Sequence, residues 1–336
     1  MRRLSWPGWL IVAGVVLLAV AAALFVAPSD QYIYLPDEAR PLAPRVQVAG
    51  ERRDRDGGGI HYVAVDVRKA SLLEKLVPGL HEGATFEDVD DVLAEGEDER
   101  ARRRTELSAM ERSQEYAAAV ALRALGYRIP ARRLGVQVDG TLRGYPAAER
   151  LRRGDWIRAV DGRRVRRRAD VTAALRRAEP GDVVRLGIER RSKRATVSLR
   201  AVEWPQLPGR AFVGMTIDDV FDVVALPVEV KIDLGQVGGP SAGLAFALDV
   251  LEELGRHVDR GYRIAATGEL ELDGTVRPVG GLKQKTIAAR RSGMNVFLVP
   301  VHNAPEARRY AKTLRILPVE SFQQALQKLA TLPRSA

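Results

Sequence analysis

The sequence has no cysteine and very few lysines, and both shortages limit its chemistry. Without cysteine, the chain can form no disulfide bond, cysteine nucleophile or thiolate zinc site. The 336 residues carry a formal net charge of +10, yet only eight of them are lysines. Arginine keeps its proton, whereas a buried lysine can lose it, so an amine base would have to be one of these few lysines.

The chain also lacks a nucleotide phosphate loop. No stretch fits Gly-x-x-x-x-Gly-Lys-Ser/Thr, and the run GLKQKT at 281–286 lacks the glycine before its final Lys-Thr. We therefore expect no ATPase module, no cofactor and no metal. The arginine-rich runs at 163–168 and 190–194 contain no aromatic residues, so the positive charge does not indicate a nucleic-acid partner.

One long apolar run lies near the N-terminus. Residues 9–28 contain no charge and are long enough to cross a bilayer as a helix. Arg2 and Arg3 precede this run, so the positive-inside rule places residues 1–8 in the cytoplasm and the rest of the chain outside the cell membrane. A cleaved signal peptide remains the alternative, because alanines at 21–23 would allow cleavage.

Composition and periodicity divide the remaining chain into five segments. In order, they are a linker (29–58), an N-terminal strand and helical arm packing on the C-terminal domain (59–128), a small β-rich domain (130–202), a second linker (203–210) and that C-terminal α/β (α+β) domain (211–334).

The β-rich segment resembles a PDZ domain. The resemblance lies in GYPAAERLRRGDWIRAVDGRRV, from residue 144, and EPGDVVRLGIER, from residue 179. PDZ domains bind a peptide as an added strand at a sheet edge, beside a loop of backbone N–H groups. The resemblance implies a groove between one strand and the helix expected over 170–178, lined by Leu134, Gly135, Val136, Val171 and Leu175. The alternative is a packing module that only spaces the rest of the chain.

Ser241 lies in the run GGPSAG at 238–243, at the start of an apolar helix expected over 240–254. Taken alone, such a serine is most simply a helix cap. The run also fits Gly-x-Ser-x-Gly, the elbow of α/β-hydrolases, for which His302 could serve as the base. A third interpretation is a nucleophile activated by a lysine.

The second expected helix favours the third interpretation. On a helical wheel from residue 282, Lys285 falls between Ala288 and Ala289, whereas Lys283 falls on the opposite side. Burial on the small, apolar face would lower the pKa of Lys285. A neutral amine at this position can take the proton of a serine hydroxyl.

Thr267 and two glycines complete the candidate site. Thr267 follows an expected strand at 264–266, where its hydroxyl can direct the lysine. An oxyanion hole needs backbone N–H groups, which Pro240 lacks, so Ser241 and Gly239 are the candidates. Gly238 and Gly239 also leave the backbone bare enough for a peptide to lie alongside.

The segments GGPSAGLAFAL, ATGELELDGTVRPVGGLKQKTIAARRSGMNVFLVP and HNAPEA look like the proteolytic domain of Lon proteases, over residues 211–334. This resemblance implies that Ser241 is the nucleophile, Lys285 the general base and Thr267 the residue supporting the lysine. One departure is Gly238, where ATP-dependent Lon proteases commonly carry an acidic residue.

The whole chain resembles the YlbL-like bacterial family of membrane-anchored, Lon-like serine proteases with an embedded PDZ domain. The resemblance implies an ATP-independent serine endopeptidase with a Ser-Lys dyad, anchored in the bilayer by one helix. It would cleave extracytoplasmic peptides or unfolded proteins, with the PDZ-like domain capturing or regulating them, and would form a hexamer by analogy. The alternative is a catalytically inactive PDZ/Lon-like scaffold that binds envelope proteins.

Overall fold

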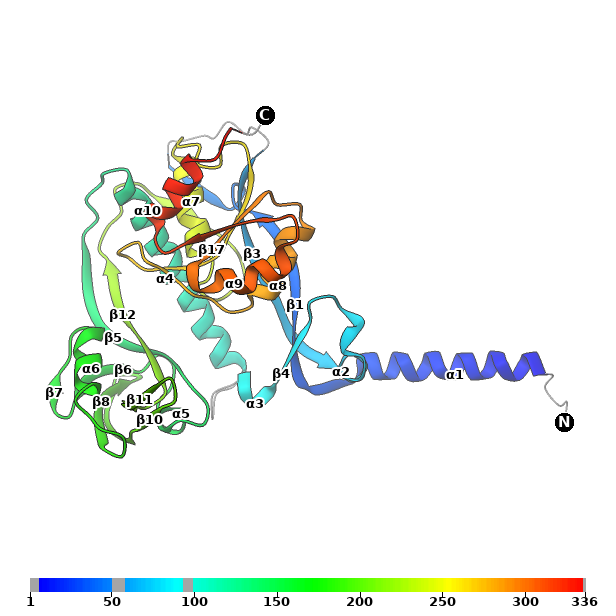
Figure 1. Cartoon of the computed structure of the whole chain (residues 1–336), viewed down its shortest axis with the longest axis horizontal. Coiled ribbons are helices and arrows are strands. Elements are labelled where there is room, and N and C mark those ends of the chain that lie inside the picture. The colour runs from blue at the N-terminus through cyan, green and yellow to red at the C-terminus, as the bar shows by residue number, and fades with distance from the viewer. Residues whose placement is uncertain (1–5, 50–57, 93–98, 335–336) are drawn as a thin grey trace.

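Two six-stranded sheets organise the chain in the computed structural model, which describes residues 6–49, 58–92 and 99–334 (Figure 1). The larger sheet has four parallel strands and two antiparallel strands at one edge. Its central strands are buried on both faces, which suits their continuous apolar runs. In spatial order the strands are β18 (Arg315–Val319), β17 (Val296–Pro300), β14 (Arg263–Ala266), β3 (Gly59–Ser71), β1 (Pro28–Pro41) and β4 (Thr85–Asp88).

Helices cover this sheet and hold the candidate site. All residues of α7 (Gly243–Glu253) up to Glu252 are buried, as expected of a helix that is apolar nearly all round. The alanine-rich C-terminal half of α4 (Glu99–Ala124) packs on α7. On the other side, α8 (Leu282–Arg291) packs on β1 and β3. Two more helices, α9 (Ala304–Ala311) and α10 (Phe322–Ala330), pack beside β18.

The smaller sheet forms the core of the PDZ-like domain. Asp161 and Gly162 both have positive φ angles (48° and 76°) and join two antiparallel strands in a tight hairpin, as an Asp-Gly pair favours. Two helices, α5 (Pro146–Arg150) and α6 (Arg168–Leu175), belong to this domain. Its strands are β12 (Met215–Val223), β5 (Ala131–Thr141), β6 (Trp156–Val160), β8 (Val183–Arg190) and β9 (Lys193–Arg200), with β7 (Arg163–Arg164) paired to β6.

The prediction of a linker over 29–58 is wrong for the residues that the structure describes. They form β1 and β2 (Val46–Val48), which pairs with β13 (Val230–Ile232). The sequence analysis did not predict strand β1, because its segment is charged and contains prolines, which are unfavourable inside a sheet. Strand β4 pairs only with residues 31–34 of β1. Pro36 and Pro41 lie beyond this stretch, where β1 pairs with β3 alone. The other edge of β1 is exposed there, and an exposed edge tolerates proline.

The prediction of a second linker over 203–210 is also wrong. Residues 202–212 form a hairpin of β10 (Val202–Trp204) and β11 (Leu207–Phe212). The rings of Trp204 and Phe212 stack with their centroids 5.2 Å apart, which stabilises the pairing. The expected α/β boundary at residue 211 is likewise displaced, because β12 belongs to the smaller sheet.

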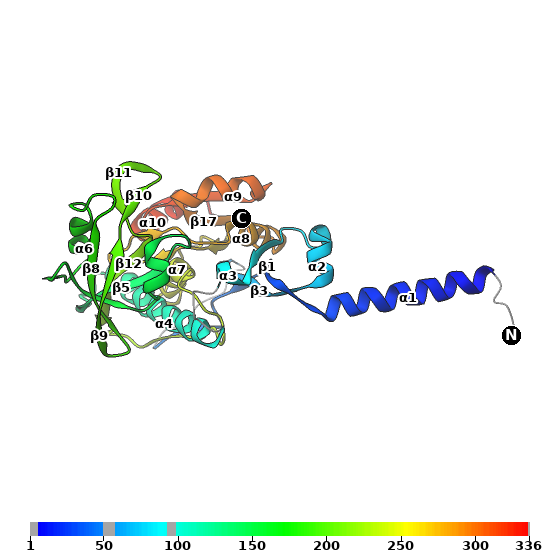
Figure 2. The same ribbon diagram turned by 90° about the horizontal axis from the view of Figure 1, so that it is seen from below.

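Helix α1 (Trp6–Val26) projects from the molecule at the end opposite the PDZ-like domain (Figures 1 and 2). It ends before Pro28, the first residue of β1. Across residues 6–49, 58–92 and 99–334, no helix meets the length and hydropathy needed to cross a bilayer. The transmembrane helix predicted over 9–28 is therefore not confirmed, and residues 1–5 lie outside the described part of the chain.

Candidate active site

Ser241 lies on a turn that leads into α7, two residues before the helix begins at Gly243. The helix was expected to start at Pro240. The Ser241 carbonyl oxygen accepts hydrogen bonds from Gly268 N–H at 2.8 Å and from Thr267 Oγ1 at 3.1 Å. Gly268 has a φ of 149°, and a Cβ there would lie 2.6 Å from Val276 Cγ1. Glycine therefore lets the turn after β14 come close enough to fix the serine backbone.

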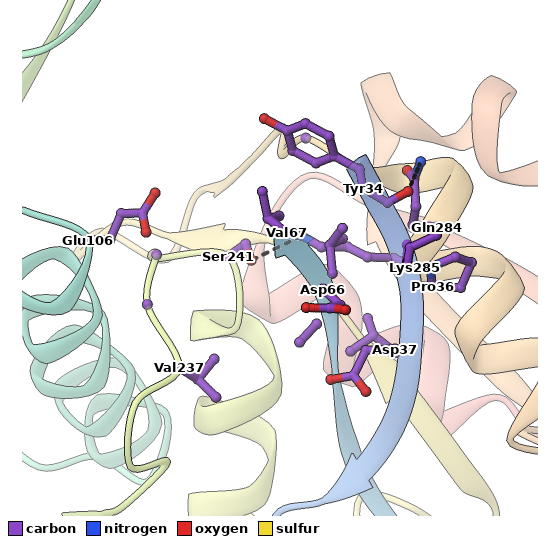
Figure 3. Close-up of a pocket in the computed structure, with 18 of the residues that line it drawn as sticks. Tyr34, Pro36, Asp37, Asp66, Val67, Glu106, Val237, Ser241, Gln284 and Lys285 are labelled. Carbon is purple, nitrogen blue, oxygen red and sulfur yellow. Dashed lines mark hydrogen bonds between the residues drawn. The ribbon is translucent and has the colours of Figure 1, made fainter. Parts of the chain in front are cut away.

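Lys285 reaches the serine from α8. Its Nζ donates a hydrogen bond to Ser241 Oγ at 3.0 Å (Figure 3). The same Nζ donates to Thr267 Oγ1 at 3.4 Å. The predicted apolar face of α8 is confirmed, since Lys285 is only 4% exposed and Ala288 and Ala289 are buried. Lys283 stays half-buried on the other side, and its Nζ bonds to the carbonyl of Ala84.

Burial also sets the acidity of the lysine. Loss of solvation lowers the Lys285 pKa from its ordinary 10.5 to about 8. The amine is thus close enough to neutrality near physiological pH to accept a proton from Ser241 Oγ, which lies at hydrogen-bond distance. Hydrogen bonds join Ser241, Lys285 and Thr267 into one continuous group, although Ser241 and Lys285 are 44 residues apart along the chain.

The expected oxyanion donors are only partly free. The Gly239 N–H already donates to the carbonyl oxygen of Glu106 at 2.9 Å. It is not available to a substrate oxygen in this conformation, contrary to our expectation. The Ser241 N–H has no acceptor within the residues that the structure describes, so this amide is the remaining candidate.

Helix α4 contributes two residues that the sequence analysis did not identify. Ser113 Oγ donates to the carbonyl of Pro240 at 3.0 Å, and the Glu106 carbonyl holds Gly239. A Cβ at Gly238 would lie 2.9 Å from Glu106 Cβ and 3.5 Å from its Oε2. The carboxylate beside position 238 therefore comes from α4. In the sequence, only the absence of a side chain at Gly238 indicated that another residue packs closely there. Nothing in the local sequence identifies that residue as Glu106.

Two cavities meet at the nucleophile. A groove of about 1770 Å³ runs between β1, α4 and α8, with Tyr34, Glu106 and Lys285 among its lining residues. A second cavity of about 690 Å³ lies between α4, the PDZ-like sheet and the β15–β16 hairpin (Glu269–Leu270 and Val276–Arg277). Ser241 and Gly280 line both. Ser241 is therefore reachable from two sides.

A charge network surrounds the second cavity. Arg277 binds Asp218 of β12 and, at 2.9 Å, Glu271, and so joins the two domains. Glu269 is half-buried beside this group. Burial, and then the negative charges of Asp218 and Asp139, raise the Glu269 pKa to about 7, although Arg277 opposes the shift.

The strand edge that was predicted to receive a peptide is already paired in the structure. Gly135 and Val136 lie opposite Val220 and Asp219 of β12, and Leu134 falls at a register shift. Val171 is fully buried in the domain core, and Leu175 of α6 packs against the same core. The edge expected to receive a peptide is thus occupied by a strand of the same chain.

The hydrolase-elbow interpretation is not supported, because β13 ends at Ile232 and no strand leads directly into Ser241. His302 lies in a short 3-10 helix, Val301–Asn303. Among the residues with described positions, no three His, Cys, Asp or Glu side chains gather in a way that could hold a metal ion.

Comparison with known families matches both domains. Residues 218–331 match the Lon protease (S16) C-terminal proteolytic domain, and residues 123–200 match the PDZ domain. Lon protease 1 of Myxococcus xanthus is 38% identical over 100 residues, 29% of this chain and 12% of that protein. Lon protease 2 of Bacillus subtilis is 30% identical over 121 residues, 36% of this chain and 21% of that protein. The chain therefore matches only a small part of these relatives.

Among solved structures, the solution structure of a Geobacillus thermodenitrificans protein is 33% identical and covers 24% of this chain and 94% of that one, with a TM-score of 0.23. The PDZ domain of an SdrC-like protein from Listeria monocytogenes is 23% identical over 25% of this chain and 86% of that one, also with a TM-score of 0.23. Together with the family matches, the sequence relatives establish that this chain contains the proteolytic domain of the Lon serine peptidases and a PDZ domain.

Proposed function

We propose that the protein is a serine endopeptidase that works with a Ser241–Lys285 dyad. The observation that carries this proposal is the 3.0 Å contact between Lys285 Nζ and Ser241 Oγ in a site where burial lowers the lysine pKa. Neutral Lys285 takes the hydroxyl proton while Ser241 Oγ attacks a peptide carbonyl. The resulting ammonium gives that proton to the leaving amine as the C–N bond breaks. Water then hydrolyses the acyl-enzyme with the same lysine as base.

Extended polypeptide is the substrate class that fits the site. The groove beside Ser241 has a volume of about 1770 Å³, whereas pockets for small molecules measure about 300–1,000 Å³. Its walls come from β1 and α4 as well as from the Lon-type domain, so residues outside that domain take part in binding. We propose that cleavage needs no ATP, because the sequence contains no phosphate-binding loop. Substrates are then peptides or segments that unfold on their own.

We also propose that α1 tethers the protein to the cell membrane, with the catalytic part outside the cytoplasm. The helix carries no charge, and large apolar side chains such as Leu17, Leu18 and Val26 are 71–80% exposed. Exposed apolar surface of this extent marks a contact with lipid or protein. Assembly into a hexamer remains a prediction from the Lon resemblance. Comparing the sedimentation of the full chain with and without liposomes, and its mass in detergent, tests both proposals.

Cleavage of an unstructured protein by the full chain in detergent tests the enzymatic proposal. We expect Ser241→Ala and Lys285→Ala each to lower kcat/KM at least about a hundredfold, because the nucleophile or its base is lost. Lys285→Arg should be equally inactive, since arginine keeps its proton. Lys283→Ala, the same change on the same helix, should cleave at nearly the wild-type rate. Equal cleavage by all four variants would refute the dyad.

A serine-directed activity probe provides a second measurement that does not depend on the choice of substrate. Wild-type protein should become labelled at Ser241, and the label should disappear in Ser241→Ala. If the probe labels neither protein, while β5 and α6 still bind peptides, the alternative of an inactive scaffold is correct.

A further inference from the structure

The peptide-binding edge of the PDZ domain is filled by β12. This strand pairs antiparallel with β5 from Met215 opposite Thr141 to Val223 opposite Ala131, while the other edge of β5 pairs with β6. PDZ ligands bind in this way, as one additional strand. A segment of the chain itself therefore takes the position in which a peptide would bind.

The contacts of β12 with α6 support the same interpretation. The backbone N–H of Arg168, the first residue of α6, donates to Asp219 Oδ1 at 2.8 Å. Met215 and Ile217 pack against the core that contains Val171. The strand thus contacts both walls of the groove, with backbone pairing on β5 and side chains on α6 and the core.

The side chains that hold β12 define the chemistry of the groove. Asp219 forms an ion pair with Arg133 at 2.5 Å, and Asp222 forms one with Arg132 at 2.9 Å. The Arg133 guanidinium also lies 4.5 Å from the centre of the Phe221 ring. The β5 edge is therefore basic, and the strand it receives consists mainly of acidic and apolar residues. Each ion pair is partly exposed and contributes at most about 1 kcal/mol, so a competing strand can replace it.

The same strand also holds the two domains together. Asp218 binds Arg277 of the Lon-type domain, and the Phe221 N–H donates to Tyr116 Oη of α4 at 2.8 Å. Asp218, Arg277 and Ser241 line the second cavity. Removing β12 from β5 would loosen contacts at the wall of the cavity that contains the nucleophile.

We propose that β12 is an internal ligand of the β5–α6 groove, and that an extended segment of a substrate protein, rich in acidic and apolar residues, binds there by displacing it. Calling this partner a substrate rests on the proposed peptidase function, whereas the displacement does not. The PDZ domain then selects acidic, unstructured segments, and their binding changes the domain junction beside Ser241.

A disulfide bond between β5 and β12, which can be formed and reduced at will, tests whether β12 must leave the groove. Arg132 and Asp222 are opposite each other, their side chains form an ion pair, and the chain has no other cysteine to interfere. Opposite residues of antiparallel strands have Cα atoms about 4.5–5.5 Å apart, within the range that a disulfide spans. The full chain with Arg132→Cys, Asp222→Cys and Ser241→Ala is titrated with a fluorescent peptide of residues 215–223, MTIDDVFDV.

We expect the reduced protein to bind the peptide and the oxidised protein to bind at least about tenfold more weakly, because a locked strand can no longer leave the groove. The Ser241→Ala background prevents cleavage, so loss of peptidase activity does not affect this result. Equal affinity in the two redox states, or no binding in the reduced state, would overturn the proposal.

The peptide chemistry is tested with the same reduced protein. Replacing the three aspartates of the peptide by asparagine keeps its length and apolar residues but removes its charge. We expect the asparagine peptide to bind at least about fivefold more weakly. It loses the ion pair with Arg133, and its amide oxygen accepts a weaker hydrogen bond from the Arg168 N–H than a carboxylate does. Equal binding of both peptides would exclude acidic recognition.

Discussion

Thr267 Oγ1 donates a hydrogen bond to the carbonyl oxygen of Ser241 at 3.1 Å and accepts one from Lys285 Nζ at 3.4 Å. The threonine therefore connects the lysine with the backbone of the serine. Its side chain is fully buried, so water cannot replace it when the hydroxyl is removed.

Thr267→Val should lower kcat about fivefold with little change in KM, because one hydrogen bond of about 1 kcal/mol that directs Lys285 is lost while the shape is kept. Thr267→Ser keeps the hydroxyl and should retain most of the activity. Steady-state kinetics on a peptide substrate measure both. A fully active Thr267→Val protein would show that the hydroxyl does not direct the lysine.

The peptidase activity should rise with pH through about 8. Lys285 must be neutral to accept the serine proton, and its pKa is about 8, so the protonated, inactive form dominates below that pH. The value of kcat/KM should increase almost tenfold per pH unit below about 7 and level off above about 9. A flat profile between pH 6 and pH 9 would contradict a lysine base.

The same lowered pKa means that the lysine favours folding more at pH 10.5 than at pH 8, because the unfolded chain binds the proton more tightly.

Gly238→Ala should destabilise the contact between α4 and the nucleophile loop. The new Cβ would lie 2.9 Å from Glu106 Cβ and 3.4 Å from its backbone carbon, so the two segments must move apart. We expect a loss of about 1–3 kcal/mol in the free energy of unfolding. Gly79→Ala, where nothing lies within 4 Å of the added atom, is the matched control.

The double variant Gly238→Ala/Glu106→Gly removes the atom that clashes. Thermal unfolding should then show a smaller cost for Gly238→Ala than in the wild-type background, despite the helix penalty of glycine itself. If the losses in unfolding free energy of the two single variants simply add in the double variant, the clash between position 238 and Glu106 is not what destabilises Gly238→Ala.

Glu269→Gln should stabilise the protein at pH 8 and have little effect at pH 4. The pKa of Glu269 is raised from 4.5 to about 7, so its stabilising contribution is complete below 4.5 and is lost as the pH rises through 7. Asp218, Asp139 and Glu271 repel the charged form, and Arg277 alone attracts it. The difference in unfolding free energy between variant and wild type should grow to at most about 3 kcal/mol. A constant difference from pH 4 to pH 8 would contradict this assignment.

Residues that act through local pattern could be predicted from the sequence. The wheel of α8 separates Lys285 from Lys283 because neighbouring turns of one helix determine which face is apolar. The Asp161-Gly162 hairpin follows from the backbone angles that these two residues tolerate. The approach of Thr267 to Lys285 was inferred from its place after a strand, and the structure brings the two side chains together.

Features that depend on distant partners could not be predicted. The Glu106 carbonyl accepts the Gly239 N–H because α4 packs against a loop that lies 133 residues further along the chain. The strand β12 combines acidic and apolar residues in a sequence that fits either domain, and its register on β5 decides between them. The prolines of β1 are acceptable because that part of the strand has a free edge, which is a property of the sheet rather than of the segment.

Ser241 and Gly280 line both the groove and the second cavity, and this has a consequence for the pattern of cleavage. We expect a bound polypeptide to extend from the cleaved bond into both cavities, so that the distance from a terminus does not determine where the bond breaks. Fragments should therefore vary in length, with cuts at internal positions from the first turnover onward.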